Sequence, residues 1–188
     1  MSFPVKFKKV AAGVDLAISG NVGADYMVII VVGLDELNRI WLLHMTRLHG
    51  AGYNEQIATL QRINHNFNPS VILMETNGFQ KIMSQLSRDN GINNIVEFTT
   101  TGNNKKDAYE GLPSLAVLFE RGEFKFPRGD EKSRELTNLV AGELNSVAFD
   151  DDRGKLESVG EHDDTAMALF FATKALKYIS NDIFLSMI

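Results

Sequence analysis

The stretch VAAGVDLA (10–17) is the first of three apolar segments near the start of the chain, and YMVIIVVG (26–33) and IWLLHMTRL (40–48) follow it. Two polar stretches separate these segments: ISGNVGAD (18–25), rich in Gly, Asn and Asp, and LDELNR (34–39). Turn residues placed between β-branched, apolar runs are typical of consecutive strands. We therefore expect the chain to begin with three strands that pair as an antiparallel meander.

Beyond residue 50 the apolar side chains change their spacing. Ile57, Leu60, Ile63 and Phe67 follow helical periodicity, which predicts an amphipathic helix over 53–67 that Asn68-Pro69 ends. The same patterns predict strands at 70–74, 95–99 and 123–126, helices at 79–88, 107–120, 131–144 and 162–178, a polar loop at 100–106, and a hairpin of 146–149 with 156–159. Pro113 either starts or kinks the helix 107–120. A meander followed by alternating helices and strands predicts an α/β protein, a mixed sheet of three antiparallel and further parallel strands flanked by helices, in the strand order of the ribonuclease H-like fold.

The composition is that of one globular domain. The 188 residues are 44% hydrophobic and 23% charged, which excludes a disordered or fibrous chain. The absence of cysteine excludes a disulfide scaffold, a thiol nucleophile and a Cys-based zinc site. No signal peptide is expected, and the longest apolar run, 27–34, is too short to span a bilayer. The net charge of −5 argues mildly against a protein that coats nucleic acid.

Carboxylates interrupt the hydrophobic pattern at three places. Asp15 lies inside the first apolar segment, Glu75 directly follows the buried strand SVILM, and Asp163 and Asp164 open an otherwise apolar helix. Each has an ordinary explanation as a strand-end cap, the first polar residue of a loop, or a helix N-cap. However, an N-cap needs one Asp, and this helix begins with two.

In a ribonuclease H-like sheet these three places converge. Unpaired carboxylates at such short distances could not all stay ionised, and divalent cations would resolve the conflict. Oxygen ligands with few histidines and no cysteine favour Mg²⁺ or Mn²⁺ over zinc. Two such ions, roughly 4 Å apart, are suited to hydrolysis of a phosphodiester bond.

The sequence resembles the nuclease domain of bacteriophage large terminases over residues 10–178. The matching stretches are GVDLA (13–17), Asp25-Tyr26, ILMETNGFQ (72–80), Lys105-Lys106, LFERGEFKFP (118–127) and HDDTAMALFFA (162–172). The resemblance implies a metal-dependent endonuclease that cuts double-stranded concatemeric viral DNA during genome packaging, in the cytoplasm of the infected bacterial host. It also implies three protein partners, namely the ATPase domain of the same subunit, the portal protein and the small terminase subunit, and no membrane partner.

The resemblance carries the catalytic, metal-binding carboxylates onto Asp15, Glu75, Asp163 and Asp164. Helical spacing leaves open which of the adjacent pair is the direct ligand, with a slight preference for Asp164. Asp25 is a weaker candidate, either a water-mediated or second-metal ligand or a turn residue that enters a strand.

Accessory and DNA-contacting residues complete the expected site. His162 either orients a ligand or leaving group or is a half-exposed residue before a helix. Phosphate contacts should come from basic residues around the acidic cleft, first Lys105 and Lys106, then Arg121, Lys125 and Arg128.

The chain departs from full-length large terminases in one respect. It contains no phosphate-binding loop, because its only Gly-Lys pair, Gly154-Lys155, is followed by Leu156. We therefore expect an isolated C-terminal nuclease domain (10–180) with a linker remnant (1–9) before it and a tail (181–188) after it. The alternatives are a Holliday-junction resolvase or transposase-like nuclease, and a docking module of the packaging motor with little nuclease activity.

Overall fold

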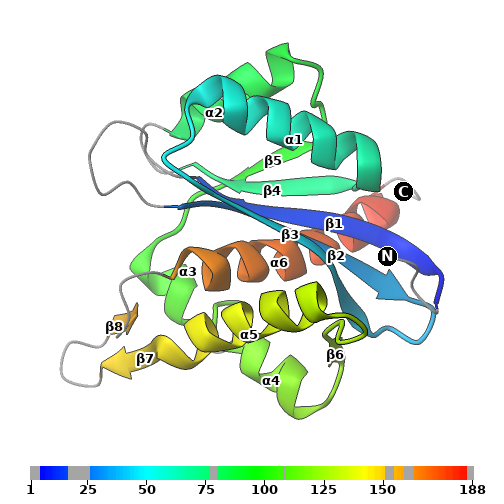
Figure 1. The fold of residues 1–188 in the computed structure, drawn as a ribbon, viewed down its shortest axis with the longest axis vertical. Helices are drawn as coiled ribbons and strands as arrows, with labels where there is room; N and C mark the ends of the chain where they lie inside the picture. Colours follow the sequence, from blue (N-terminus) through cyan, green and yellow to red (C-terminus); the bar gives the residue numbers. More distant parts are fainter. Residues whose placement is uncertain are drawn as a thin grey trace.

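A mixed sheet flanked by helices forms the domain (Figure 1). The computed structural model describes residues 5–16, 26–76, 80–107, 109–150, 155–158 and 163–185. The six strands of the sheet are β1 (Phe7–Asp15), β2 (Tyr26–Asp35), β3 (Ile40–His49), β4 (Val71–Glu75), β5 (Ile95–Phe98) and β6 (Phe124–Lys125). The helices are α1 (Tyr53–Phe67), α2 (Gln80–Asp89), α3 (Gly102–Lys106), α4 (Ser114–Glu120), α5 (Glu131–Ser146) and α6 (Asp164–Leu185). A separate hairpin contains β7 (Val147–Asp150) and β8 (Lys155–Ser158).

The strand order is β5-β4-β1-β2-β3-β6. β1, β2 and β3 pair antiparallel, as the turn-separated apolar segments predict. β4 pairs parallel with β1, β5 with β4, and β6 with β3. The predicted α/β fold, a meander extended by parallel strands, is therefore confirmed.

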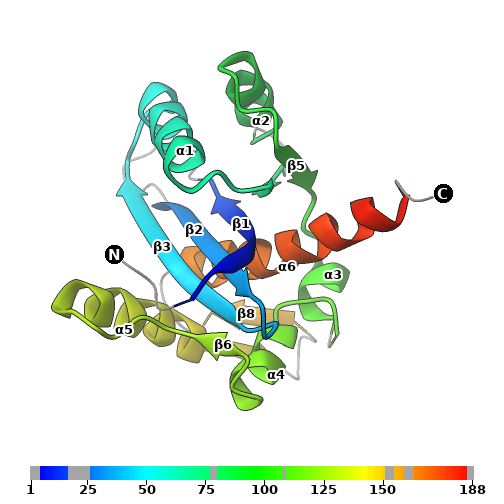
Figure 2. The same ribbon diagram turned by 90° about the vertical axis from the view of Figure 1, so that its right-hand side faces the viewer.

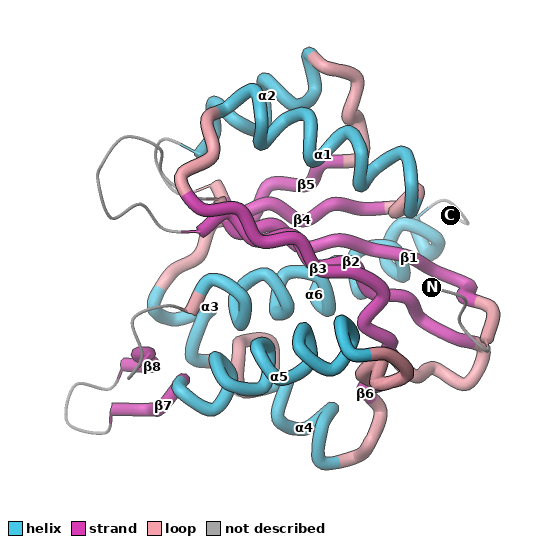
Figure 3. Tube along the Cα trace, viewed as in Figure 1, coloured by secondary structure: helices cyan, strands magenta, loops and turns pink. Residues whose placement is uncertain are grey.

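Helices cover both faces of the sheet, with α1 and α2 on one side and α4, α5 and α6 on the other (Figures 2 and 3). Side chains of the central strand β2 alternate between the two faces, which explains its continuous apolar sequence. Met27, Ile29 and Val31 pack on the side of α1, and Val28, Ile30 and Val32 pack on the side of α6.

α6 lies directly against β1 because a glycine allows close approach. A Cβ atom built on Gly13 would lie 2.1 Å from the backbone nitrogen of Ala172 and 2.2 Å from the carbonyl oxygen of Ala168. No side chain fits there, so Gly13 sets the spacing between the strand that ends in Asp15 and the helix that begins at Asp164.

Several boundaries differ from the sequence prediction. β1 begins at Phe7, so residues 7–9, which we expected in a linker, belong to the sheet. α6 continues to Leu185, so most of the expected tail 181–188 is helical. Pro113 starts a helix, as one of its two expected roles requires, but α4 is confined to Ser114–Glu120 rather than beginning at 107.

The segment 100–106, expected as a loop, contains the short helix α3. The side chain of Thr101 accepts a hydrogen bond from the Asn104 backbone, and the Asn104 side chain accepts one from the Thr101 backbone. This reciprocal cap stabilises a turn that has no apolar face. Among the described helices, none is both long and apolar enough to cross a membrane.

Candidate active site

Asp15 and Glu75 meet at the carboxyl ends of two adjacent parallel strands. Val14 pairs with Met74, so the next residues, Asp15 at the end of β1 and Glu75 at the end of β4, lie at the same edge of the sheet. This is the edge at which α/β sheets place their ligands. It lies at the left of Figure 1.

Asp15 is nearly inaccessible to water, with 8% of its surface exposed. Burial raises the pKa of Asp15 well above its ordinary value, and the charges of Glu75, Asp164 and Asp163 raise it further. A side-chain hydrogen bond with Glu75 acts in the same direction. The structure therefore brings all four predicted catalytic carboxylates into one electrostatic cluster, which we call the acidic cluster (Asp15, Glu75, Asp163 and Asp164).

The two aspartates at the start of α6 differ in their surroundings. Asp164 is buried, with 9% of its surface exposed, and its charge raises the pKa of Asp15 more than that of Asp163 does. Asp163 is more accessible, with 30% of its side chain exposed. The geometry therefore favours Asp164 as the inner member of the pair.

Lys105 reaches the acidic cluster from α3. Its ammonium lies 2.8 Å from Oδ2 of Asp163. Sequence reasoning expected Lys105 to contact phosphate from a loop, but could not place it beside a particular carboxylate. This ion pair joins α3 to Asp163, the residue directly before α6.

Glu143 on α5 also touches the start of α6, and the sequence analysis missed it. Its Oε2 accepts a hydrogen bond from the backbone N–H of Thr165 at 2.8 Å, and its Oε1 lies 3.2 Å from the Arg47 guanidinium. A signal existed in the sequence, because Glu143 follows Val140 at helical spacing on the buried side of α5. The guanidinium of Arg47 in turn lies 3.7 Å from the ring centre of Tyr26.

Lys125 lies at the other end of the sheet from the acidic cluster. It pairs with Trp41 on β3, and Trp41 pairs with Gly33 on β2, which pairs with Val10 on β1. From Val10 to Asp15 the strand advances ~17 Å at the usual rise per residue. Lys125 is therefore not brought to the site, contrary to the sequence-based expectation.

The remaining candidates are not joined to the cluster by any described contact. Arg121 and Arg128 are exposed on either side of β6, the strand at the far end of the sheet. Lys106 belongs to α3, but its side chain lies outside the described part of the chain. Asp25 and His162 also lie outside the described residues.

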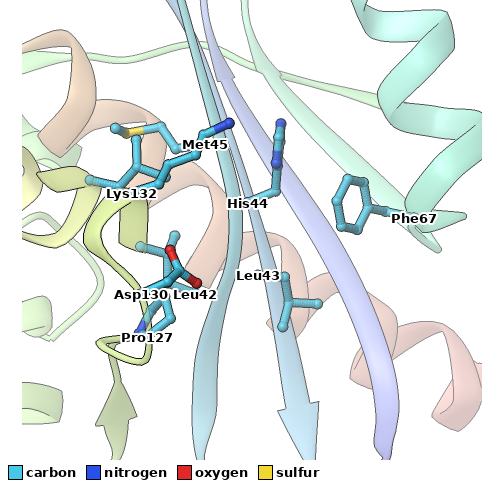
Figure 4. Close-up of a pocket in the computed structure, with 9 residues that line it drawn as sticks. Leu42, Leu43, His44, Met45, Phe67, Pro127, Asp130 and Lys132 are labelled. Carbon is cyan, nitrogen blue, oxygen red and sulfur yellow. The ribbon is translucent and has the colours of Figure 1, made fainter. Parts of the chain in front are cut away.

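Two cavities lie elsewhere on the domain. One of about 420 Å³ straddles the middle of β3, with His44 turned toward Phe67 on one side and Met45 and Lys132 on the other (Figure 4). Burial lowers the pKa of His44, and the charges of Lys132 and Arg62 lower it further. A second cavity of about 710 Å³ lies between α4 and α6. Neither is lined by a member of the acidic cluster.

The donor set of the acidic cluster fits hard divalent cations in its chemistry. It offers only carboxylate oxygens, and three of the carboxylates raise the pKa of the buried fourth, a repulsion that a cation would relieve. Within the described residues, however, no three His, Asp or Glu side chains already surround a point that could hold a metal ion. The side chains of the acidic cluster are instead engaged in an Asp15–Glu75 hydrogen bond and an Asp163–Lys105 ion pair.

Solved structures with this fold include large terminases of two phages. The large terminase nuclease from thermophilic phage G20c, solved with bound magnesium, has a TM-score of 0.67 and 23% identity, over 87% of this chain and 79% of that chain. The same nuclease has been solved with bound cobalt and with bound zinc. The HK97 bacteriophage large terminase has a TM-score of 0.65 and 13% identity, over 93% of this chain and 40% of that chain.

A more distant structure is the yeast mitochondrial Holliday junction resolvase Ydc2, with a TM-score of 0.50 and 14% identity over 93% of this chain and 80% of that chain. At these identities the likenesses establish the ribonuclease H-like fold. No curated protein sequence matches the chain.

A family model described as the terminase RNase H-like domain matches residues 12–176, nearly the whole of the described sheet and the buried part of α6. The expected enzyme class, an endonuclease that hydrolyses DNA phosphodiester bonds, agrees with this match and with the terminase nucleases above. The chain therefore belongs to the terminase RNase H-like domain family, as the resemblance in its motifs predicted.

Proposed function

We propose that this domain is the metal-dependent endonuclease of a phage packaging motor, and that it cuts concatemeric double-stranded DNA at the acidic cluster. Its partners would be the ATPase domain of the same subunit, the portal protein and the small terminase subunit, in the cytoplasm of the infected bacterium. The observation that carries the proposal is the burial of Asp15 among Glu75, Asp163 and Asp164. Four carboxylates gathered at the carboxyl ends of β1 and β4 destabilise the folded protein through their mutual repulsion, so their arrangement supports a functional role.

Asp15, Glu75 and Asp164 would hold the cations most directly, with Asp163 as the more exposed fourth ligand. Two Mg²⁺ or Mn²⁺ ions, when bound, supply activation of a water molecule and stabilisation of the departing 3′ oxygen. The protein's own contribution is to fix the carboxylates on rigid elements, the ends of β1 and β4 and the first turn of α6. Lys105, which pairs with Asp163 at the same edge, would contact a DNA phosphate next to the cluster.

Isosteric amides at the cluster test the proposal. We expect Asp15→Asn and Glu75→Gln to abolish nicking of supercoiled plasmid in Mn²⁺ or Mg²⁺. Asp15→Asn should unfold at the same urea concentration as the parent or a higher one, because it removes a buried, repelled carboxylate. Asp89→Asn, an exposed carboxylate on α2, is the matched control and should cut like the parent.

Three further arms separate the competing functions. EDTA should abolish plasmid nicking by the parent protein, since the proposed cleavage depends on a bound metal ion. A four-way junction cut in strong preference to linear duplex would identify a junction resolvase instead. Absence of Mn²⁺ binding at millimolar concentration in calorimetry, together with an inactive parent, would favour a docking module. If both amide variants cut like the parent, the assignment of the acidic cluster is wrong.

A further inference from the structure

The first turn of α6 begins directly after Asp163, which occupies the N-cap position. The first backbone N–H groups of a helix have no partner within the helix, and a Ser, Thr, Asp or Asn just before the helix usually accepts one of them. Asp163 occupies this position, directly before Asp164. Its backbone carbonyl accepts the first helical hydrogen bond, from Met167 at 2.9 Å.

The side chain of Asp163 does not serve as this cap. It contacts Lys105, and the N–H of Thr165 donates instead to Glu143, which belongs to another helix and lies 22 residues earlier in the chain. The cap of α6 is therefore supplied from outside. As a result, the side chain of Asp163 is not used for the cap and pairs with Lys105 beside the acidic cluster.

Glu143 is itself held in place. Its side chain is 13% exposed, and its second oxygen lies 3.2 Å from the guanidinium of Arg47, which is 20% exposed. The guanidinium carbon of Arg47 lies over the ring of Tyr26, at 3.7 Å from the ring centre. The chain of contacts therefore runs from β2 through β3 and α5 to the first turn of α6.

We propose that Glu143 is a positioning residue of the nuclease site, which fixes the first turn of α6 through the Thr165 N–H so that Asp163 and Asp164 face Asp15. This inference rests on the proposed function, because it assigns to Glu143 an effect on the same metal site. Glu143 would act through the helix backbone, because its Oε2 accepts the hydrogen bond from the Thr165 N–H. Residues that orient metal ligands in this way affect metal affinity or activity by about 10- to 100-fold when they are replaced.

Three substitutions separate the reach of the side chain from its charge. Glu143→Ala removes both. Glu143→Gln keeps an oxygen at the same reach but removes the charge, and Glu143→Asp keeps the charge but is one methylene too short to reach Thr165. Glu135→Ala, at an exposed position of the same helix, is the control.

Two measurements are made on each folded variant. The first is backbone amide exchange at Thr165, because an amide in the first turn of a helix exchanges rapidly unless a group outside the helix accepts its hydrogen bond. The second is Mn²⁺ binding by calorimetry, together with the Mn²⁺ concentration that gives half-maximal plasmid nicking. We expect slow exchange at Thr165 in the parent, in Glu143→Gln and in Glu135→Ala. We expect at least tenfold faster exchange and about 10- to 100-fold weaker Mn²⁺ binding in Glu143→Ala and Glu143→Asp.

The opposite ranking overturns the proposal. If Glu143→Asp matches the parent and Glu143→Gln is as impaired as Glu143→Ala, the charge of Glu143 matters and the cap does not. Faster exchange throughout the chain in Glu143→Ala, with no excess at Thr165, would show a general loss of stability and would also reject the inference. Rapid exchange at Thr165 in the parent rejects it without any variant, even if Glu143→Ala does not fold.

Failure of the proposed function gives a different result. A parent that neither binds Mn²⁺ nor nicks DNA would reject the nuclease assignment, while slow exchange at Thr165 would still show that Glu143 caps α6. A parent that binds Mn²⁺ and cuts, with Glu143→Ala and Glu143→Asp equal to it, would keep the nuclease assignment and reject the positioning role.

Discussion

Replacement of Gly13 by alanine tests the link between the packing of α6 and the chemistry at its start. Gly13 lies on β1, two residues before Asp15, where the backbone of α6 passes directly over the strand. The added Cβ atom would lie 2.1 Å from the nitrogen of Ala172 and 2.2 Å from the oxygen of Ala168, whereas ordinary contact begins at 3.4 Å. Both are backbone atoms, so no side-chain rotation relieves the overlap.

The size of the effect follows from this overlap. α6 must move away from β1 by more than about 1 Å, and overpacking of a core by one methyl group typically costs ~1–3 kcal/mol of folding stability. Because both contacts are with helix backbone, we expect a loss of ~3 kcal/mol, at the upper end of that range. A displacement of this size also moves Asp164 relative to Asp15, and misplacement of catalytic groups by ~1 Å can reduce the rate by about 100-fold.

Urea unfolding and plasmid nicking measure the two effects separately. The chain has one tryptophan, Trp41, whose fluorescence reports unfolding. Gly142→Ala is the matched control, since a Cβ atom at Gly142 on α5 meets no atom within 4 Å. This control should stabilise the protein by up to ~1 kcal/mol, because alanine favours the helix more than glycine does. A Gly13→Ala protein with the parent's urea midpoint and the parent's nicking rate would refute the reasoning, because β1 and α6 would then tolerate the separation.

Two further predictions concern charged side chains at opposite ends of the sheet. Burial alone would raise the pKa of Asp35, but hydrogen bonds from Trp41, Arg39 and two backbone N–H groups lower it from 3.8 to about 2. Because the pKa of Asp35 is lower in the folded state, its ionised form stabilises the fold above the pKa of the unfolded chain, and this stability should be lost between about pH 4 and pH 2. Asp35→Asn should be less stable than the parent at pH 7 and should lack this pH dependence, which acid unfolding followed by fluorescence measures. Lys105→Ala removes the ammonium group that pairs with Asp163, so the variant should bind Mn²⁺ more tightly in calorimetry. It should also bind duplex DNA more weakly, with a salt dependence reduced by about one phosphate contact. Lys125→Ala, at the far end of the sheet, should leave Mn²⁺ affinity unchanged; equal Mn²⁺ affinity and equal salt dependence in Lys105→Ala and the parent would contradict the role of Lys105.

The fold and the acidic cluster could be predicted because both depend on regular patterns. The period of the apolar residues distinguishes strands from helices, and carboxylates that break this period mark the strand ends and the helix start. Asp15 and Glu75 come together because parallel strands end at the same edge, which follows from topology alone. The order of the elements was therefore sufficient to bring these two residues together.

Features held by caps and long-range contacts could not be predicted in the same way. α3 has five residues and no apolar face, so it gives no periodic signal, and only the Thr101–Asn104 cap indicates it. The position of β6 beside the start of β3 depends on only two residue pairs, Ile40 with Phe124 and Trp41 with Lys125, and no local sequence pattern predicts them. For this reason Lys125 was expected near the acidic cluster and lies far from it.

Glu143 could have been found by the rule that found Asp15. It is a carboxylate on the buried side of an amphipathic helix, in line with Val140, and Arg47 breaks the apolar alternation of β3 on the same side of the sheet. Their pairing, however, joins two elements almost a hundred residues apart, and the N–H of Thr165 that Glu143 accepts is not visible in any side-chain pattern. Only the structure shows that Glu143 of α5 accepts a hydrogen bond from the first turn of α6.

The net charge of −5 is compatible with a DNA substrate because of where the charges lie. Two divalent cations would offset the four carboxylates of the acidic cluster, and this offset falls entirely at the edge where the DNA would be cut. In the absence of metal the ammonium of Lys105 pairs with Asp163, which neutralises part of the charge that it could offer to a DNA phosphate. On the proposed function, a cation that takes over Asp163 releases Lys105 for the phosphate, so metal and DNA strengthen each other's binding. On this proposal, the acidity that first argues against a nucleic-acid partner would make the domain bind DNA weakly until metal is bound.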